Sequence, residues 1–231
     1  MKRVRLALLL GFLAVSCLLF SQTGGPSSPA VVSFTLDFPQ SIPAHYSIVV
    51  DSSGKASYTS GVAEKAADSD SETTSDSDQL YRYSFTVSPT TRERIFDLTA
   101  HANYFSGDVN YAKRNVVNTG QKILTYKGAQ RSTEAKYNYS TNPAVQQLTA
   151  LFQGLSTTLE YGRRLDEAYH YQKLALDEQL KGMEEQAGQN VLVDVQAIAP
   201  ILKKIAADSS VINVTRARAQ RLLAKAGTTV P

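Results

Sequence analysis

The sequence predicts an α+β protein: an antiparallel sheet of about five strands covered by two helices, followed by an all-helical C-terminal extension. Two observations support this fold class. Before residue 140, several short segments alternate apolar and polar residues between turn signals, which is typical of strands joined by hairpins. Two other segments before residue 159, and the whole of 159–227, repeat apolar residues at helical spacing. Hairpin-connected strands favour an antiparallel sheet with one face open to covering helices.

The N-terminus has the features of a secretory signal. Three basic residues among the first five precede Leu6–Phe20, which carries no charge, and this order is typical of a signal peptide. The apolar segment is shorter than the roughly 20 residues that a membrane-spanning helix needs. We therefore expect residues 1–21 to be a cleaved signal peptide and residues 22–30 to be a linker. A retained membrane anchor is the competing interpretation.

Composition excludes two classes of protein. Cys17 is the only cysteine and lies in the signal segment, so the mature chain cannot be one of the small secreted domains that disulfides stabilise. Lipid attachment at Cys17 is an alternative, but the apolar run continues beyond it. The net charge of +3 equals the charge of the three basic residues in the signal segment. The mature chain is therefore close to neutral, and we expect no nucleic-acid partner, because such binders are normally strongly basic.

Four segments account for the first strands of the predicted sheet. Residues 32–38, 46–50, 55–60 and 80–87 each alternate apolar with polar side chains. Asp51-Ser52-Ser53-Gly54 is a turn signal, which makes the second and third segments a hairpin.

An acidic loop is expected between the third and fourth of these strands. Residues 61–78 contain six carboxylates, one lysine and no aromatic residue. Such a segment buries too little apolar surface to offset the entropy of ordering it, so we predict disorder. Asp68, Asp70 and Glu72 have the spacing that begins a calcium loop. The later glycine and glutamate positions of that loop do not match, so no metal is expected here.

Two helices and a second hairpin complete the predicted α+β domain, 31–158. Ser88-Pro89 and Asn142-Pro143 are helix starts, because the first residue of each pair caps free amide groups and proline fits the first turn. The first helix is expected to continue through Phe105. Between the helices, segments 123–126 and 132–139 flank a turn and are predicted to pair.

The helical extension, 159–227, shows no strand pattern. Its first apolar stripe runs without interruption from Leu165 to Met183, which predicts one continuous helix up to Gly188. A second stripe follows, and Pro200 is expected to kink or divide it. A last helix, ended by Gly227, completes a helical hairpin plus one further helix. An alternative is that the extension continues directly from the second helix of the α+β domain.

Three runs resemble a family of uncharacterised exported proteins from soil bacteria, a domain of unknown function. They are Tyr83–Leu98, Thr119–Tyr126 and Asn213–Leu223. The resemblance covers most of the mature chain. It implies export and a bacterial source, and it assigns no activity.

Motifs for catalysis and cofactor binding are missing from the sequence. His45, His101 and His170 occur singly, and no metal-binding pair of histidines is present. The chain has no G-x-S-x-G motif and no phosphate-binding glycine loop. We expect no cofactor and no metal, and a non-catalytic protein. A hydrolase-like enzyme whose active site is scattered along the chain is the alternative.

Tyrosines are the first weak candidates for binding. The chain has twelve tyrosines and no tryptophan, and four of the tyrosines lie at alternate positions of two strands. On an exposed sheet face they would stack on sugar rings or hold a partner protein. The competing interpretation places them in the core. These candidates are Tyr81, Tyr83, Tyr137 and Tyr139.

A basic stripe on the last helix is the second weak candidate. Arg218, Arg221 and Lys225 share one helical face, which would suit an anionic membrane surface or an acidic partner. Alternatively, the cations interact only with solvent and the helix dipole.

Together these observations predict an exported protein, periplasmic or extracellular, that binds or scaffolds another envelope protein or a polysaccharide. Contact with a membrane is expected only through the signal segment before cleavage.

Overall fold

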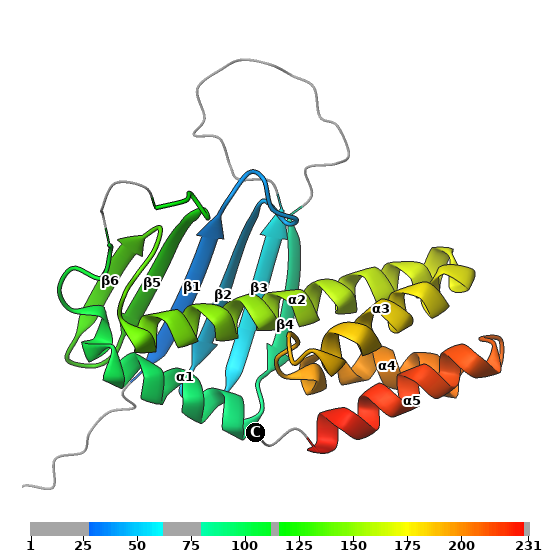
Figure 1. Cartoon of the computed structure of the whole chain (residues 1–231). Helices are drawn as coiled ribbons and strands as arrows, with labels where there is room; N and C mark the ends of the chain where they lie inside the picture. The colour runs from blue at the N-terminus through cyan, green and yellow to red at the C-terminus, as the bar shows by residue number, and fades with distance from the viewer. Residues whose placement is uncertain (1–27, 62–79, 112–115, 229–231) are drawn as a thin grey trace, which may run out of the picture.

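The computed structural model describes residues 28–61, 80–111 and 116–228. They form an antiparallel sheet with helices on one face and a helical region beside it (Figure 1). The predicted α+β class with a helical C-terminal region is confirmed, and the six strands of the sheet are close to the predicted number of about five. The predicted signal peptide, 1–21, lies outside the described residues, as do most of the linker, 22–30, and of the acidic loop, 61–78.

Every segment with a strand pattern is part of the sheet, which explains the additional strand. The order is β4-β3-β2-β1-β5-β6 and all neighbours are antiparallel, so β1 is central and β4 and β6 are the edges. The strands are β1 (Val31–Asp37), β2 (His45–Asp51), β3 (Lys55–Gly61), β4 (Tyr81–Thr86), β5 (Gln121–Lys127) and β6 (Ser132–Tyr137).

The two faces of the sheet differ because successive side chains of a strand point to opposite sides. On the helix-covered face, Phe34, Ile48 and Leu124 are fully buried, and Phe34 stacks on Phe152 of the covering helix with ring centroids 5.3 Å apart. The opposite face is rich in hydroxyl side chains, among which Thr35 donates a hydrogen bond to Ser47.

Helix α1 (Pro89–His101) begins as predicted, because the Ser88 hydroxyl accepts a hydrogen bond from the Thr91 amide. It ends four residues before Phe105, the predicted last apolar position. The backbone of Asn103–Phe105 adopts left-handed φ angles of 49°, 52° and 62°, so the helix cannot continue. This turn places Phe105 in the core, where it is 1% exposed.

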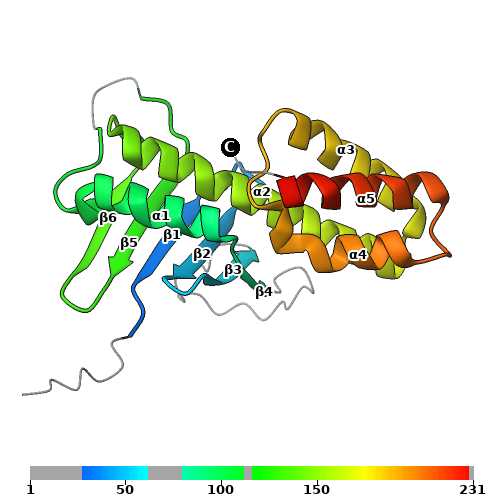
Figure 2. The same ribbon diagram turned by 90° about the horizontal axis from the view of Figure 1, so that it is seen from below.

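Helix α2 (Pro143–Tyr171) is shared by the sheet and the helical region. Its N-terminus is capped by Asn142, as predicted. The helix covers the sheet and continues past β4 to the other helices (Figures 1 and 2). Residues 158 and 159, on either side of the predicted boundary, lie inside this one 29-residue helix, as the alternative of a continuous helix expects.

The helical region has one more interruption than predicted. The backbone leaves the helix at Gln172, so the expected continuous helix is two helices. Pro200 lies in the first turn of α4, where a missing amide proton costs nothing, and it marks a helix start and not a kink. The remaining elements are η2 (Lys173–Ala175), α3 (Leu176–Gly188), η3 (Val195–Ile198), α4 (Ala199–Ala207) and α5 (Asn213–Thr228).

Two glycines of α2 let the helical region pack closely against it. A Cβ atom at Gly154 would lie 2.6 Å from Val193 Cγ2, and one at Gly162 would lie 2.5 Å from Ile198 Cγ2. Thr158, between them, donates a hydrogen bond of 2.8 Å to the Val193 carbonyl. This face of α2 thus needs small side chains.

None of the helices within the described ranges is both long and apolar enough to cross a membrane.

Candidate binding site

A groove lies where the sheet domain meets the helical region. Its volume is about 650 Å³, and it is lined by the first turn of α1, by α2, by the loop after α3 and by the end of α5. In Figure 2 the N-terminal end of α1 and the C-terminal end of α5 approach each other beside α2. Apolar side chains in the lining include Leu151, Leu192 and Val193, together with Val191, which is 43% exposed.

The loop 190–194 forms one wall of this groove because of its unusual backbone. Asn190 and Asp194 bound it with φ angles of 57° and 54°, a conformation that residues with a side chain adopt infrequently. Between these bends, the amide of Val193 donates a hydrogen bond to the Gly154 carbonyl of α2. Backbone conformations of this kind concentrate at binding sites, so the loop is a reasonable part of a functional surface.

Two charged residues line the groove, and their surroundings differ. The Asp194 carboxylate accepts a 2.7 Å hydrogen bond from the Ser88 amide at the start of α1, where a negative charge suits the helix dipole. Burial raises the pKa of Asp194. Arg94 is exposed and makes no ion pair within the described ranges. The carboxylate therefore has a structural partner, whereas the guanidinium is available to a ligand.

A buried polar cluster lies between the sheet and α2. Glu160 is 5% exposed, and one of its oxygens accepts hydrogen bonds of 2.7 Å from the hydroxyls of Tyr58 and Ser60. Its other oxygen accepts a 2.9 Å bond from Arg163 Nε. Burial, with a smaller effect of the Glu160 charge, raises the pKa of Tyr58. The cluster is fully hydrogen-bonded, as a buried charge must be, and it does not line the groove.

The four candidate tyrosines lie on opposite edges of the sheet. Tyr81 and Tyr83 of β4 stack with ring centroids 6.4 Å apart, and the Tyr83 hydroxyl donates to the Ala197 carbonyl. At the other edge, Tyr137 is buried and its hydroxyl lies 2.7 Å from that of Thr149. Burial raises the pKa of Tyr81 and of Tyr137 to about 12. Tyr139 is 42% exposed, so the structure gives two separate pairs and not one row.

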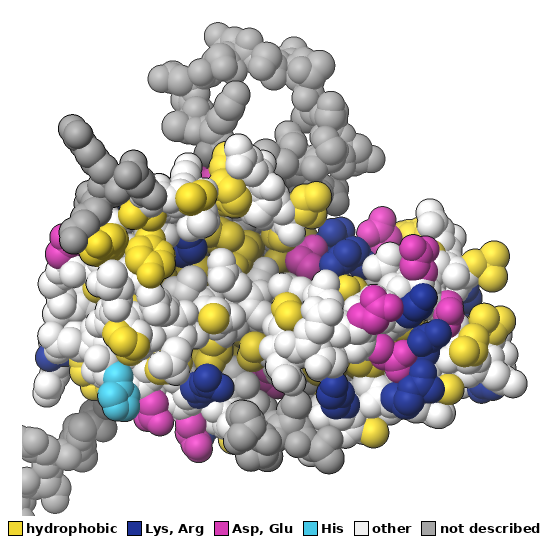
Figure 3. Space-filling view, in the orientation of Figure 1, with side chains coloured by type: hydrophobic (Ala, Val, Ile, Leu, Met, Phe, Trp, Pro, Cys, Tyr) yellow, Lys and Arg dark blue, Asp and Glu magenta, His cyan; other side chains and the backbone are white. Residues whose placement is uncertain are grey.

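The three candidate cations of α5 do lie together, and they face α3. Arg218 forms ion pairs with Asp177 at 2.9 Å and Glu184 at 2.6 Å. Arg221 also pairs with Glu184, at 2.8 Å, and Lys225 Nζ donates to a carbonyl of α3 at 2.7 Å. Figure 3 shows basic and acidic side chains interspersed over this region. The basic stripe thus joins two helices of the same chain.

Sequence reasoning missed both the groove and the buried cluster. The groove combines segments that are far apart in the sequence, and no local pattern indicates it. Glu160 did carry a signal, because a carboxylate beside Leu159 interrupts the apolar stripe of a helix.

Within the described ranges, no group of three or more His, Cys, Asp or Glu side chains is placed to hold a metal ion.

Comparison with known proteins gives no relative of this chain. No family model matches the chain, and no curated protein matches it. The resemblance to exported proteins from soil bacteria therefore stays a prediction.

Proposed function

We propose that this chain is an exported, non-catalytic binding protein that holds an apolar segment of a partner polypeptide in the groove between α1, α2 and α5. The observation that carries the proposal is the groove itself. Its volume of about 650 Å³ falls within the range of about 300–1,000 Å³ that is usual for ligand sites. It also combines apolar side chains with a few polar ones, as such sites do.

The composition of the lining favours a polypeptide. Leu192 and Val193 offer apolar contacts, and the exposed Val191 extends this surface toward solvent. Gln147 and Gln196 lie in the same lining, and their amides both donate and accept hydrogen bonds, as peptide groups do. An apolar segment with an adjacent carboxylate would also match the unpaired Arg94. The lining is therefore complementary to a peptide with apolar side chains.

The charged groups of the groove favour binding over catalysis. The guanidinium of Arg94 donates hydrogen bonds and accepts none, and the Asp194 carboxylate already accepts a bond from the backbone of α1. The alternative, a hydrolase, would need substrate to reach an acid–base pair. The best such group in the described part of the chain is Glu160 with Tyr58, and both side chains are buried and bonded to each other.

Export is part of the proposal and rests on the N-terminal sequence. Leu6–Phe20 is uncharged and follows three basic residues, the order expected of a secretory signal. The N-terminal sequence of the protein isolated from an envelope or culture fraction tests this point. Uncleaved chain in the cytosol would contradict it.

The groove is tested by a charge placed at its mouth. Val191→Glu should abolish capture of the partner from envelope extract by the tagged mature protein, because the new carboxylate would lie against apolar side chains of the partner. Val117→Glu is a matched control, since Val117 is 77% exposed and does not line the groove. Overlapping synthetic peptides of the captured protein, measured by fluorescence polarisation, should then locate one apolar segment. Equal peptide affinity of both variants would refute the groove as the site.

A further inference from the structure

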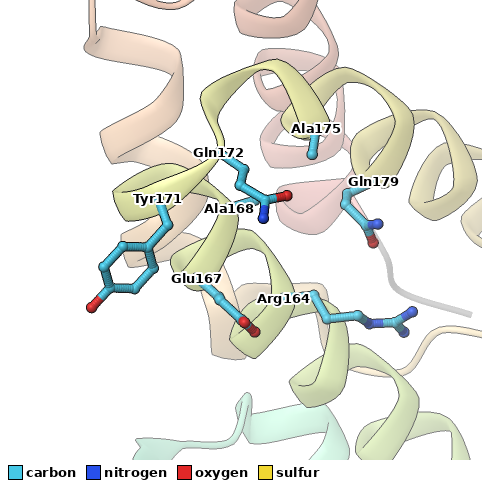
Figure 4. Close-up of a pocket in the computed structure, with 7 residues that line it drawn as sticks. All are labelled: Arg164, Glu167, Ala168, Tyr171, Gln172, Ala175 and Gln179. Carbon is cyan, nitrogen blue, oxygen red and sulfur yellow. The ribbon is translucent and has the colours of Figure 1, made fainter.

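A second, smaller pocket lies at the opposite end of the helical region, in the elbow between α2 and α3. It forms because Gln172 leaves the helix with φ −147° and ψ 60°, after which η2 turns the chain and α3 runs back along α2. The pocket has a volume of about 170 Å³. Figure 4 shows the side chains that line it, which come from α2, from the turn and from α3.

The polar side chains of this pocket have groups available to a ligand. Gln172 and Gln179 lie on facing sides of it (Figure 4), and neither side-chain amide has a hydrogen bond within the described ranges. Arg164 Nε donates to a carbonyl of its own helix, and its guanidinium lies over the Tyr161 ring, 4.6 Å from the ring centroid. Its terminal amino groups form no hydrogen bond within the described ranges, so they can donate to a ligand. Glu167 lies 3.6 Å from Arg163 and is 64% exposed, so its carboxylate can accept further bonds.

The remaining side chains give the pocket a small apolar base and an aromatic edge. Ala168 is buried and Ala175 is half-buried, so the base has room for a ring. Tyr171 also lines the pocket and is 82% exposed, and Figure 4 shows it at the edge, with its ring pointing away from the other labelled side chains. Tyrosine normally buries most of its ring, and an exposed ring beside a polar recess is a ready stacking surface.

We propose that this elbow binds one pyranose ring of a polysaccharide. Sugar hydroxyls donate and accept hydrogen bonds at once, which matches the two amides, the guanidinium donors and the carboxylate acceptor. The apolar C–H face of the ring would stack on Tyr171. The volume is below that of sites for drug-sized ligands, so the pocket takes a single ring and the rest of the polysaccharide lies outside it.

A neutral ligand fits this pocket better than a charged one. Arg164 and Glu167 have opposite charges, and both are exposed to solvent, which screens ionic attraction and leaves exposed ion pairs with little net stabilisation. Affinity must therefore come from hydrogen bonds and stacking. The site is separate from the groove of the proposed function, and the inference does not depend on that proposal.

Nuclear magnetic resonance of the mature protein tests this inference directly. Titration with cellotetraose or with the β-1,4-linked tetramer of N-acetylglucosamine should shift the side-chain amide signals of Gln172 and Gln179 in a saturable way. Tyr171→Ala and Gln179→Ala should each raise the dissociation constant about tenfold, the effect of one lost hydrogen bond or ring contact. Gln153→Ala is the matched control, because Gln153 is exposed on α2 away from the pocket.

Three results would overturn the inference. An absence of saturable shifts at these two amides with both tetramers would show that the pocket binds no sugar of this kind. Equal affinity of the Tyr171→Ala and Gln153→Ala variants would place any sugar binding elsewhere. Shifts caused by free glutamate or arginine, with none caused by the tetramers, would show that the ligand is charged. Val191→Glu should leave sugar binding unchanged, which separates this test from that of the groove.

Discussion

The ionised side chains that connect separate elements lie in different places in the sheet domain and in the helical region. In the sheet domain, Glu160 is buried between the strands and α2 and is fully hydrogen-bonded. In the helical region, the ion pairs of Arg218 with Glu184 and of Lys173 with Asp208 are partly exposed. Both regions have an apolar core, which includes Phe34 in one and Leu180 in the other.

This difference predicts which substitutions and which solution conditions should destabilise each region. A buried charge that loses its partners costs several kcal/mol, whereas an exposed ion pair contributes little and is weakened by salt and acid. We therefore expect the sheet domain to be sensitive to substitution and nearly insensitive to salt. The helical region should loosen first in acid. The predictions that follow test this contrast, starting from the largest effect.

Removing the buried carboxylate should have the largest effect. Glu160→Ala is expected to lower the free energy of unfolding by about 2–4 kcal/mol, because the buried hydroxyls of Tyr58 and Ser60 lose their acceptor and the partly exposed Arg163 loses its partner. Urea denaturation followed by circular dichroism measures this. Glu160→Gln, which keeps one carbonyl acceptor, should lose less. A loss below about 1 kcal/mol for Glu160→Ala, the range of surface ion pairs, would remove the contrast between the regions.

The contact between the regions should show the next largest effect. Gly162→Ala adds a Cβ atom 2.5 Å from Ile198 Cγ2, and such overpacking costs about 1–3 kcal/mol. Gly188→Ala is the control, because Gly188 ends α3 and a Cβ there meets nothing within 4 Å. Thermal unfolding of both variants measures the difference. Equal stability would mean that α2 does not need small side chains here.

Acid should loosen α5 before the sheet. Burial acts to raise the pKa of Glu184, but hydrogen bonds from Arg221 and Arg218 outweigh it and lower the pKa. The pKa of Asp208 is also lowered, chiefly by its bond from Lys173. A carboxyl whose folded pKa lies below the unfolded one stabilises above the unfolded pKa, and loses this as the pH falls through the folded value.

Hydrogen exchange measures this effect region by region. Between neutral pH and about pH 3, below the ordinary pKa of Glu, protection of α5 amides should fall relative to β1 amides after correction for intrinsic rates. At neutral pH, Glu184→Gln should reproduce part of the loss, about 1 kcal/mol or less, as expected for partly exposed ion pairs. Parallel loss of protection in both regions would contradict the comparison.

The smallest effect is expected at the groove. Burial raises the pKa of Asp194, so its ionised form is less favourable in the folded state, and its contribution to stability declines as the pH rises through the folded pKa. Asp194→Asn keeps an acceptor for the Ser88 amide. Its melting temperature at neutral pH should equal or slightly exceed that of the unsubstituted chain, and the difference should shrink in acid. Asp194→Ala, which removes the acceptor, should be less stable than both.

The sequence was a good guide where one local pattern determines one element. Alternating patterns and turn signals marked the segments of all six strands, although a sheet of about five was expected, and the caps at Ser88 and Asn142 located the starts of α1 and α2. The break at Gln172 was missed because the apolar stripes of α2 and α3 face the same core and continue across it. The partners of Arg218 and Arg221 were missed because helical spacing shows which residues share a face, but not which helix that face contacts.

Helix α2 has a consequence for valency. Leu151 lines the groove and Ala168 lines the elbow pocket, and the helical rise places these two residues of one unbroken helix about 25 Å apart. If a partner carries both a peptide and a sugar, binding of one group to its site raises the effective concentration of the other group near the second site. The partner then binds more tightly than either group alone. That gain is available only to partners whose own spacing matches this fixed distance. The helix would then select assemblies by geometry, even where each contact alone is weak.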